Sequence, residues 1–317
     1  VYIYKKEDGF WLSDTILVSE DENIYEFGGS VFFKDDLLAI KAKYGSIGDF
    51  ETVVILYRHD GLNWNEESII PSPNFSQTFG FELMIQNGIL FISDPANDNY
   101  SGIVYQYLHI DGIWTLIDSI LPVIPLEDTS FGYSLHIFND TMIVGAHGNV
   151  FISDYSGQVY VFIHDGDSWI ETQTLLASDA SESDRFGESI HGYENTIVIG
   201  AHNNDIAGGG SGSAYIFKKS DGVWTEYKII IPSNSGNIDL FGDTVSMNSN
   251  FVFIGAPDKN GLQGAAYVYD PHDNSIHSNF AGDIRNGNAP VTVQFTSVPQ
   301  GNPISYEWDF NSDGYID

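Results

Sequence analysis

The chain contains no cysteine among its 317 residues, and it has only 12 lysine and arginine residues against 44 aspartate and glutamate residues. The absence of cysteine excludes disulfide bonds, thiolate metal sites and a cysteine nucleophile. The scarcity of basic residues leaves a formal net charge of −32. Such a surface repels nucleic acid and anionic lipid, because both are bound through lysine and arginine. We therefore expect no nucleic-acid partner.

Long apolar runs and enzyme motifs are missing as well. No stretch approaches the roughly 20 apolar residues of a membrane-spanning helix, so we expect no membrane insertion within this segment. No nucleophile elbow, phosphate-binding loop or His-Glu-x-x-His motif occurs, and no segment has helical periodicity. With 42% hydrophobic and 14% aromatic residues, the composition is that of a folded β-protein.

What the chain does contain is one pattern repeated five times. A Phe-Gly pair recurs about every 50–55 residues, and an Asp-Gly pair followed within three residues by tryptophan keeps step with it. The phenylalanines are Phe27, Phe79, Phe131, Phe186 and Phe241, and the tryptophans are Trp11, Trp64, Trp114, Trp169 and Trp224. A fixed period of this length indicates supersecondary units that bury their apolar faces only against their neighbours.

Residues 186–232 show how one repeat is built. A first short strand opens at Phe186-Gly187, and a polar turn leads to the apolar run Thr196–Ala201, which is typical of a strand buried on both faces. A polar, glycine-rich loop precedes an aromatic third strand. Asp221-Gly222 then suits a tight hairpin turn to a fourth strand. Four antiparallel strands in such a repeat predict the sheet of one propeller blade.

The other repeats fit the same template. The predicted second strands are Leu37–Ala42, Ile89–Ser93, Met142–Ala146 and Phe251–Ala256, and the predicted third strands include Tyr2–Tyr4, Val54–Tyr57, Val104–Tyr107, Val159–Phe162 and Tyr267–Tyr269. The fold class predicted is therefore all-β, a β-propeller of four-stranded blades, six of them visible in whole or in part. We expect residues 1–270 to form this propeller.

Both ends of the array look incomplete. The first repeat lacks its Phe-Gly half, Val1 is not methionine, and the last repeat, residues 241–270, lacks a tryptophan strand. We therefore expect an N-terminally truncated propeller. Residues 271–288, rich in Asn, Asp, Ser and Gly, read as a linker. Residues 289–295 and 306–310 alternate as strands of a second, truncated module that covers residues 289–317.

The repeats resemble a known family. Phe-Gly, a buried strand ending in Gly255-Ala256-Pro257, then Gly-x-x-Tyr and a later tryptophan resemble the FG-GAP repeat of integrin α-subunits and of many bacterial surface proteins. The resemblance implies an extracellular propeller, usually seven-bladed, that works in adhesion or protein binding, and a secreted or cell-surface location in a bacterium or archaeon. The calcium loops of the integrin repeats are not matched here: the corresponding turns, such as Glu194-Asn195, lack alternating carboxylates. The chain resembles the calcium-poor variant.

Residues 289–317 resemble the start of a PKD domain, an immunoglobulin-like β-sandwich, through Val293-x-Phe295 and Tyr306-x-Trp308-Asp309-Phe310. Within them, Asp309, Asn311, Asp313 and Asp317 have the spacing of the first part of an EF-hand-type loop, with Gly314 at its sixth position. The segment is a candidate Ca²⁺ site. Its Asn-Ser-Asp-Gly core is equally typical of a polar hairpin turn.

Function is expected to lie in the loops between second and third strands, because these vary while the strands do not. Candidate partner-binding residues in them are Asp94, Asn97, Asp98, His147, Asp154, His202, Asp205 and Asp258. His147 and His202 occupy the same slot of adjacent repeats, and two histidines without a placed third ligand favour a loop role over zinc.

Three functions fit these features. The first is a non-enzymatic adhesion or binding module for a protein or glycan. The second is the propeller of a secreted polysaccharide-degrading enzyme, which a cluster of carboxylates with histidine or arginine in one pocket would favour. The third is a structural spacer in a large surface protein. No cofactor is predicted other than the possible Ca²⁺.

Overall fold

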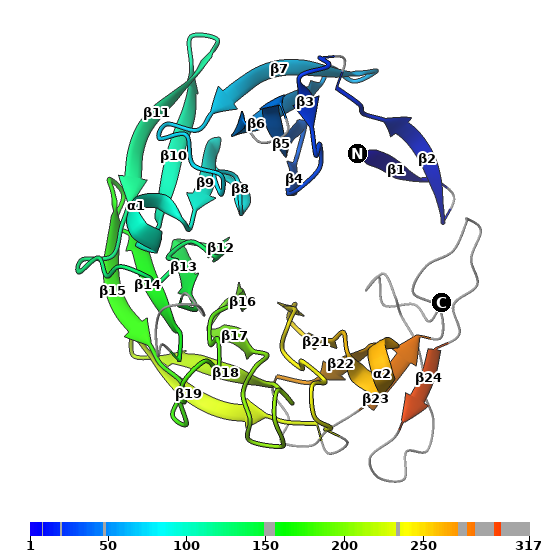
Figure 1. The fold of residues 1–317 in the computed structure, drawn as a ribbon, viewed down its shortest axis with the longest axis vertical. Helices are drawn as coiled ribbons and strands as arrows, with labels where there is room; N and C mark the ends of the chain where they lie inside the picture. Colours follow the sequence, from blue (N-terminus) through cyan, green and yellow to red (C-terminus); the bar gives the residue numbers. More distant parts are fainter. Residues whose placement is uncertain are drawn as a thin grey trace.

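A ring of small antiparallel sheets, each facing the centre with its first strand, makes up the protein (Figure 1). The computed structural model describes residues 1–7, 9–19, 21–46, 49–148, 156–232, 235–271, 278–282 and 295–298. Within them lie six sheets, and the chain visits them in order around the ring. The all-β propeller predicted from the repeat period is confirmed.

The first sheet has two strands, which correspond to the third and fourth strands of a blade. They are β1 (Tyr2–Glu7) and β2 (Phe10–Ile16). The second sheet consists of β3 (Ile24–Tyr25), β4 (Val31–Lys34), β5 (Leu37–Ser46), β6 (Asp49–His59) and β7 (Trp64–Pro71), with β3 and β4 both paired to β5. The other blades begin after Phe79, Phe131, Phe186 and Phe241.

The third blade comprises β8 (Leu83–Gln86), β9 (Ile89–Asp94), the short turn α1 (Asn97–Tyr100), β10 (Ile103–Ile110) and β11 (Ile113–Ile120). The fourth comprises β12 (Ser134–Phe138), β13 (Thr141–Ala146), β14 (Gln158–His164) and β15 (Trp169–Leu175). The fifth comprises β16 (Ser189–Tyr193), β17 (Thr196–Ala201), β18 (Ser213–Ser220) and β19 (Val223–Ile230). The strands of each blade pair in chain order, so each blade is a simple meander.

The sixth blade differs from the sequence-based expectation. It comprises β20 (Val245–Met247), β21 (Val252–Ala256), α2 (Lys259–Leu262), β22 (Ala265–Tyr269), β23 (Ser278–Gly282) and β24 (Phe295–Val298). The fourth strand, β23, comes from the segment predicted as a linker and contains no tryptophan, and β24 adds to it from the segment predicted as a second module. Pairing of β23 with β22 depends on backbone hydrogen bonds, which need no tryptophan.

The hydrophobic core is divided among the spaces between neighbouring blades. One cluster of buried side chains joins blades two and three, and three others join each later pair of blades; a smaller one joins the first two sheets. Each second strand packs against both neighbours, which is why all six residues of β13 and of β17 are buried. Because these strands are buried on both faces, they appear in the sequence as continuous apolar runs.

The Phe-Gly pair is the joint between blades. Phe79, Phe131, Phe186 and Phe241 are all fully buried, and the aromatic ring of each lies edge-on to a third-strand tyrosine of its own blade, with ring centroids 5.1–5.7 Å apart. Phe27 also lies edge-on to a third-strand tyrosine of its own blade, Tyr57, with centroids 6.2 Å apart. Its side chain is nevertheless only half-buried, because it lies beside the incomplete first sheet.

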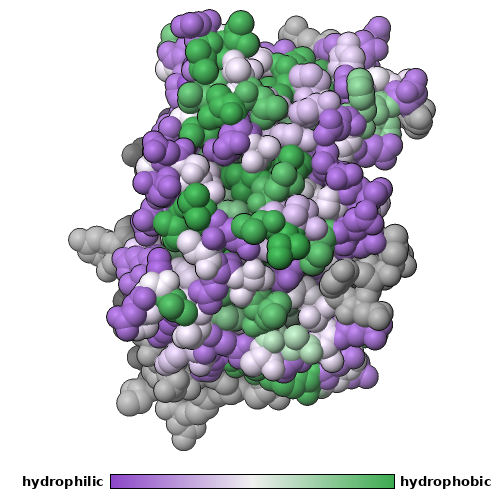
Figure 2. Space-filling model, turned by 90° about the vertical axis from the view of Figure 1, so that its left-hand side faces the viewer, coloured by the Kyte–Doolittle hydropathy of each residue, from purple (hydrophilic) through white to green (hydrophobic). Residues whose placement is uncertain are grey.

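The outer strands carry the tryptophans and leave apolar side chains on the rim. Trp114 and Trp224 are buried, Trp64 and Trp169 are half-buried, and Trp11 is 68% exposed. Unlike the other four, Trp11 does not pack on a blade, because its sheet has only two strands. Figure 2 shows scattered apolar side chains on the outer face; those of β11 include Ile113 and Leu116.

Candidate binding site

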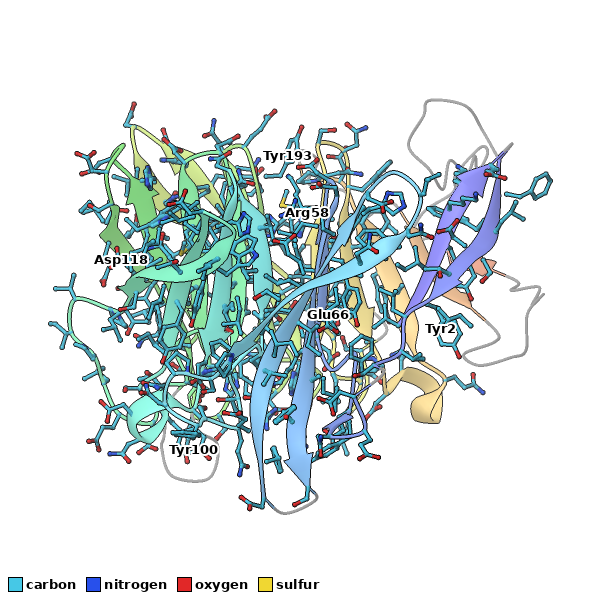
Figure 3. All side chains as sticks on the ribbon, turned by 90° about the horizontal axis from the view of Figure 1, so that it is seen from above. Tyr2, Arg58, Glu66, Tyr100, Asp118 and Tyr193 are labelled. Atoms are coloured by element: carbon cyan, nitrogen blue, oxygen red, sulfur yellow. The ribbon has the colours of Figure 1, made fainter. Side chains whose placement is uncertain are left out.

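The loops predicted to carry function lie together at one end of the ring. Figure 3 places Tyr100, from the loop of the third blade, at that end. It places Arg58, beside a third-to-fourth strand hairpin, and Tyr193, at a first-to-second strand hairpin, at the opposite end. Hairpins and loops alternate between the two ends because successive strands are antiparallel. The candidate residues therefore share one surface of the propeller.

The predicted contact residues of the third blade have different environments. Asp94 is completely buried, and its Oδ1 accepts hydrogen bonds from the hydroxyls of Ser76 (2.6 Å) and Thr78 (2.5 Å). It holds the loop from inside and presents no carboxylate at the surface. Asn97 is half-buried, and its amide lies 3.3 Å from the Tyr105 hydroxyl. Asp98 is exposed, with a left-handed backbone (φ 47°).

The remaining candidate residues also differ in how far they are exposed. Asp205 is exposed, but its carboxylate accepts a 2.7 Å hydrogen bond from the Gly210 amide and so stiffens its own loop. Asp258 is half-buried ahead of α2. His147 and His202 are both buried, at 7% and 5% exposure. Asp154 lies outside the described residues, as do Asp309, Asn311, Asp313 and Asp317, so the candidate Ca²⁺ loop stays a prediction.

A row of side chains that sequence reasoning missed crosses this end of the ring. The residue directly after each of the last four Phe-Gly pairs is, in chain order, Phe81, Tyr133, Glu188 and Asp243. The rings of Phe81 and Tyr133 lie 4.6 Å apart, and the Tyr133 hydroxyl lies 3.4 Å from Glu188 Oε1. Aligning the repeats on Phe-Gly would have revealed this slot, since equivalent positions of adjacent blades are neighbours in space.

Arg185 and the two histidines extend this row. Arg185 immediately precedes Phe186, and its Nη1 lies 3.4 Å from Glu188 Oε2 and 3.3 Å from His202 Nε2. His202 Nδ1 lies 3.1 Å from Glu188 Oε2 and 3.7 Å from Asp243 Oδ1. The Tyr133 ring stands edge-on to His147, with centroids 3.9 Å apart. His147 and His202, which occupy the same slot of adjacent repeats, thus both contact this row.

Burial controls the charges in the cluster. Desolvation, with a smaller contribution from Arg185, lowers the pKa of His147 and of His202 to about 4, so both imidazoles are neutral at pH 7. Burial also raises the pKa of the Glu188 carboxyl above its ordinary value, against the attraction of Arg185. The Asp243 carboxyl is shifted upward for the same reason, its pKa raised by burial. Arg185 is thus the charged donor at the centre.

A cavity of about 270 Å³ opens beside this row. Its lining comes from the third, fourth and fifth blades: Thr78, Phe81, Pro95, Ala96, Tyr100, Ser130, Tyr133, His147, Gly148 and Arg185. Among the described residues that line it there is no aspartate or glutamate, although the chain has 44. A larger cavity of about 510 Å³ at the opposite end includes Arg58, Asp36 and Trp114.

The smaller cavity is the better candidate because its basic groups are less engaged. At the opposite end, Arg58 pairs with both Asp36 and Glu67, and Glu67 also accepts a hydrogen bond from Trp114 Nε1 at 2.8 Å. The charged groups of that network are therefore already paired with one another. Among the described residues, no group of three or more histidine and carboxylate side chains is arranged to hold a metal ion.

A comparison with known protein families agrees with the division of the chain into blades. The FG-GAP repeat matches residues 114–162, 169–217 and 224–269, each match beginning at the tryptophan of one outer strand. Three segments of the chain, together less than half of it, thus match the FG-GAP repeat. They run from the outer strand of the third blade into the sixth blade, and they support the propeller that the sheets themselves show. No helix among the described residues has the length and apolarity to cross a membrane.

Solved structures with a similar arrangement include the β-propeller domain of the trilobed protease from Pyrococcus furiosus, at 9% identity and a TM-score of 0.49, covering 88% of this chain and 86% of that one. The acylaminoacyl peptidase of Pyrococcus horikoshii has 12% identity and a TM-score of 0.48, covering 86% of this chain and 42% of that one. This chain thus spans less than half of that peptidase. A comparison with curated proteins gives no match.

Glu82, next to Phe81, provides a pH-dependent test of this end. Burial raises its pKa to about 7, whereas Ser134 and Ser189 stand in the same slot of the next blades. Between pH 4.5 and 7 the unfolded chain releases this proton and the folded chain keeps it, so stability falls as pH rises through that range. Glu82→Gln should therefore stabilise the protein at pH 8 by about 2 kcal/mol, discounted for partial exposure, relative to its effect at pH 4.

The measurement is urea unfolding at pH 4 and pH 8. Exposed Glu127 provides the matched control, because Glu127→Gln makes the same chemical change at the surface. Equal effects of Glu82→Gln at the two pH values would show that the Glu82 carboxyl is solvated in the folded protein.

Proposed function

We propose that this chain is a non-enzymatic binding module of a secreted or cell-surface protein, which holds a protein or glycan ligand at the loop end of the propeller. The observation that supports this most directly is the cavity between three blades, lined by exposed Tyr100 and by basic and aromatic groups. The strands are occupied by packing between blades, which leaves loops free to recognise a partner. FG-GAP repeats are consistent with an adhesive role.

The enzyme alternative has one observation in its favour. Glu188, Asp243, His202 and Arg185 form the cluster of carboxylates, histidine and arginine that would favour catalysis. Glu188, His202 and Asp243 are, however, not among the residues that line the cavity, and the described residues place no serine or threonine hydroxyl on His202. We therefore interpret this cluster as an ion-pair network that positions Arg185, and not as a catalytic acid–base pair.

The test compares the two ends of the ring with matched tyrosines. Tyr100 at the loop end is 44% exposed, and Tyr193 at the hairpin end is 38% exposed. The labelled protein is bound to cell-envelope material and to arrays of immobilised proteins and glycans. Tyr100→Ala should weaken binding at least tenfold, as expected for an aromatic contact residue, while Tyr193→Ala should leave it unchanged.

Three results would contradict the proposal. Equal loss in both variants would place the contact elsewhere, and no binding by the unmodified protein would favour a spacer. Chemical change of the bound ligand, followed by mass spectrometry, would favour an enzyme.

A further inference from the structure

Two residues that line the cavity at the loop end have buried nitrogens that the protein leaves poorly satisfied. Within the described part of the chain, the buried Nε of Arg185 has no hydrogen-bond partner. The ring nitrogens of buried His147 have none of ordinary geometry, although the backbone amides of His147 and Gly148 approach the ring. Both residues line the cavity. Buried polar atoms without partners are costly and call for an explanation, such as a ligand that completes them. The natural counterpart of an arginine N–H and an imidazole N–H is an oxyanion.

We propose that this cavity binds a carboxylate carried on an apolar group, the chemistry of the C-terminal residue of a polypeptide, with Arg185 and His147 holding the carboxylate. The inference rests on the proposed function, since it specifies the ligand of the same site. It goes further by naming the chemical group recognised and the two residues that recognise it.

The distribution of charge supports an anionic group here. The chain has only 12 lysine and arginine residues, yet one of them, Arg185, lines this cavity. A second, Lys41, contacts a lining residue, with its Nζ 5.5 Å from the centre of the Phe81 ring. Glu188 engages Nη1 of the guanidinium, and an arginine has five N–H donors, so others remain for a ligand. Glu188 thereby positions Arg185.

The apolar part of the ligand follows from the rest of the lining. Phe81, Pro95, Ala96, Tyr100 and Tyr133 provide mainly carbon surface. The Thr78 hydroxyl already donates to Asp94 and accepts from the Ala96 amide, and the Tyr133 hydroxyl is directed to Glu188. A sugar acid would bring several hydroxyls with few partners, and unpaired hydroxyls oppose binding. These contacts favour an aliphatic or aromatic side chain beside the carboxylate.

The experiment uses calorimetry on the whole chain with defined probes. These are an acetylated Gly-Ser-Gly-Leu peptide with a free C-terminal carboxylate, the same peptide as its C-terminal amide, 4-methylpentanoate and glucuronate. The free-acid peptide should bind, the amide should bind at least tenfold more weakly, and glucuronate should not compete. Competition by 4-methylpentanoate at equal strength would support the same chemistry with a small free acid as its source.

Variants identify the residues. Arg185→Gln and His147→Phe should each weaken binding of the free-acid peptide at least tenfold and leave the weak binding of the amide unchanged, whereas Arg58→Gln at the opposite end should have no effect. Loss of Arg185 leaves the Glu188 carboxylate without its cationic partner, which could destabilise the fold. The double variant Arg185→Gln/Glu188→Gln removes this charge as well and should show the same loss of peptide affinity. Thermal unfolding confirms the fold of each variant.

Equal binding of peptide acid and amide, or binding of glucuronate in place of the peptide, would overturn the inference. So would an unchanged affinity in the Arg185 variants. The proposed function fails separately: if Tyr100→Ala abolishes binding to envelope material while no carboxylate probe binds or competes, the loop end is still a binding surface and only its assignment to a carboxylate is wrong.

Discussion

Trp224→Ala is expected to lower the free energy of unfolding by about 3–5 kcal/mol, the range found when a buried aromatic side chain is truncated to a methyl group. Trp224 is the second residue of β19, the outer strand of the fifth blade, and is only 3% exposed. Its ring packs edge-on against Phe138 of the fourth blade, with centroids 6.3 Å apart, and its backbone exchanges two hydrogen bonds with the Gln173 side chain. Truncation therefore opens a cavity between two blades.

Trp11→Ala is the matched control, because Trp11 follows the same Asp-Gly turn but is 68% exposed. It should cost less than about 1 kcal/mol, as surface substitutions do. Half-buried Trp169 should fall between the two. The free energy of unfolding of each variant is measured by denaturant unfolding. Both the slope and the midpoint of the transition are compared. A loss at Trp224 no greater than at Trp11 would mean that the outer strands add little to the joint between blades.

Gly212→Ala is expected to destabilise the protein by about 3–5 kcal/mol, through a clash added to backbone strain. Gly212 has a φ of 78° and forms a bridge to Phe241 of the next repeat. A Cβ atom there would lie 2.0 Å from the Phe241 carbonyl oxygen. Since that oxygen belongs to the backbone of the joint, the two blades would have to move apart.

Gly222 separates the clash from the strain. It has a similar φ of 83°, but a Cβ atom there would meet nothing within 4 Å. Gly222→Ala should therefore cost only about 1 kcal/mol, the penalty of a left-handed backbone for alanine. Unfolding of the two variants under one set of conditions gives the difference. If Gly212→Ala and Gly222→Ala agree within about 0.5 kcal/mol, close approach of the repeats is not what Gly212 provides.

Several elements could be predicted from the sequence because their causes are local or periodic. Thr196–Ala201 is a buried strand since both of its faces meet neighbouring blades, and such a strand needs an apolar residue at every position. Asp221-Gly222 forms a hairpin turn between strands that adjoin in the chain. The exposure of Trp11 and the half-burial of Phe27 could not be predicted from the repeat, because they depend on the incomplete first sheet.

The sequence alone determined the four-stranded blade, the repeat period and the joint at Phe-Gly, because the same residues recur in each repeat. Only the tertiary structure decided which loop residues are buried and which groups meet. Phe81, Tyr133 and Glu188 are separated by about 50 residues each along the chain, and the ring brings them into one row. His147 and Arg185 acquire a common cavity only there, because contacts between blades follow from how repeats stack, which no single repeat encodes.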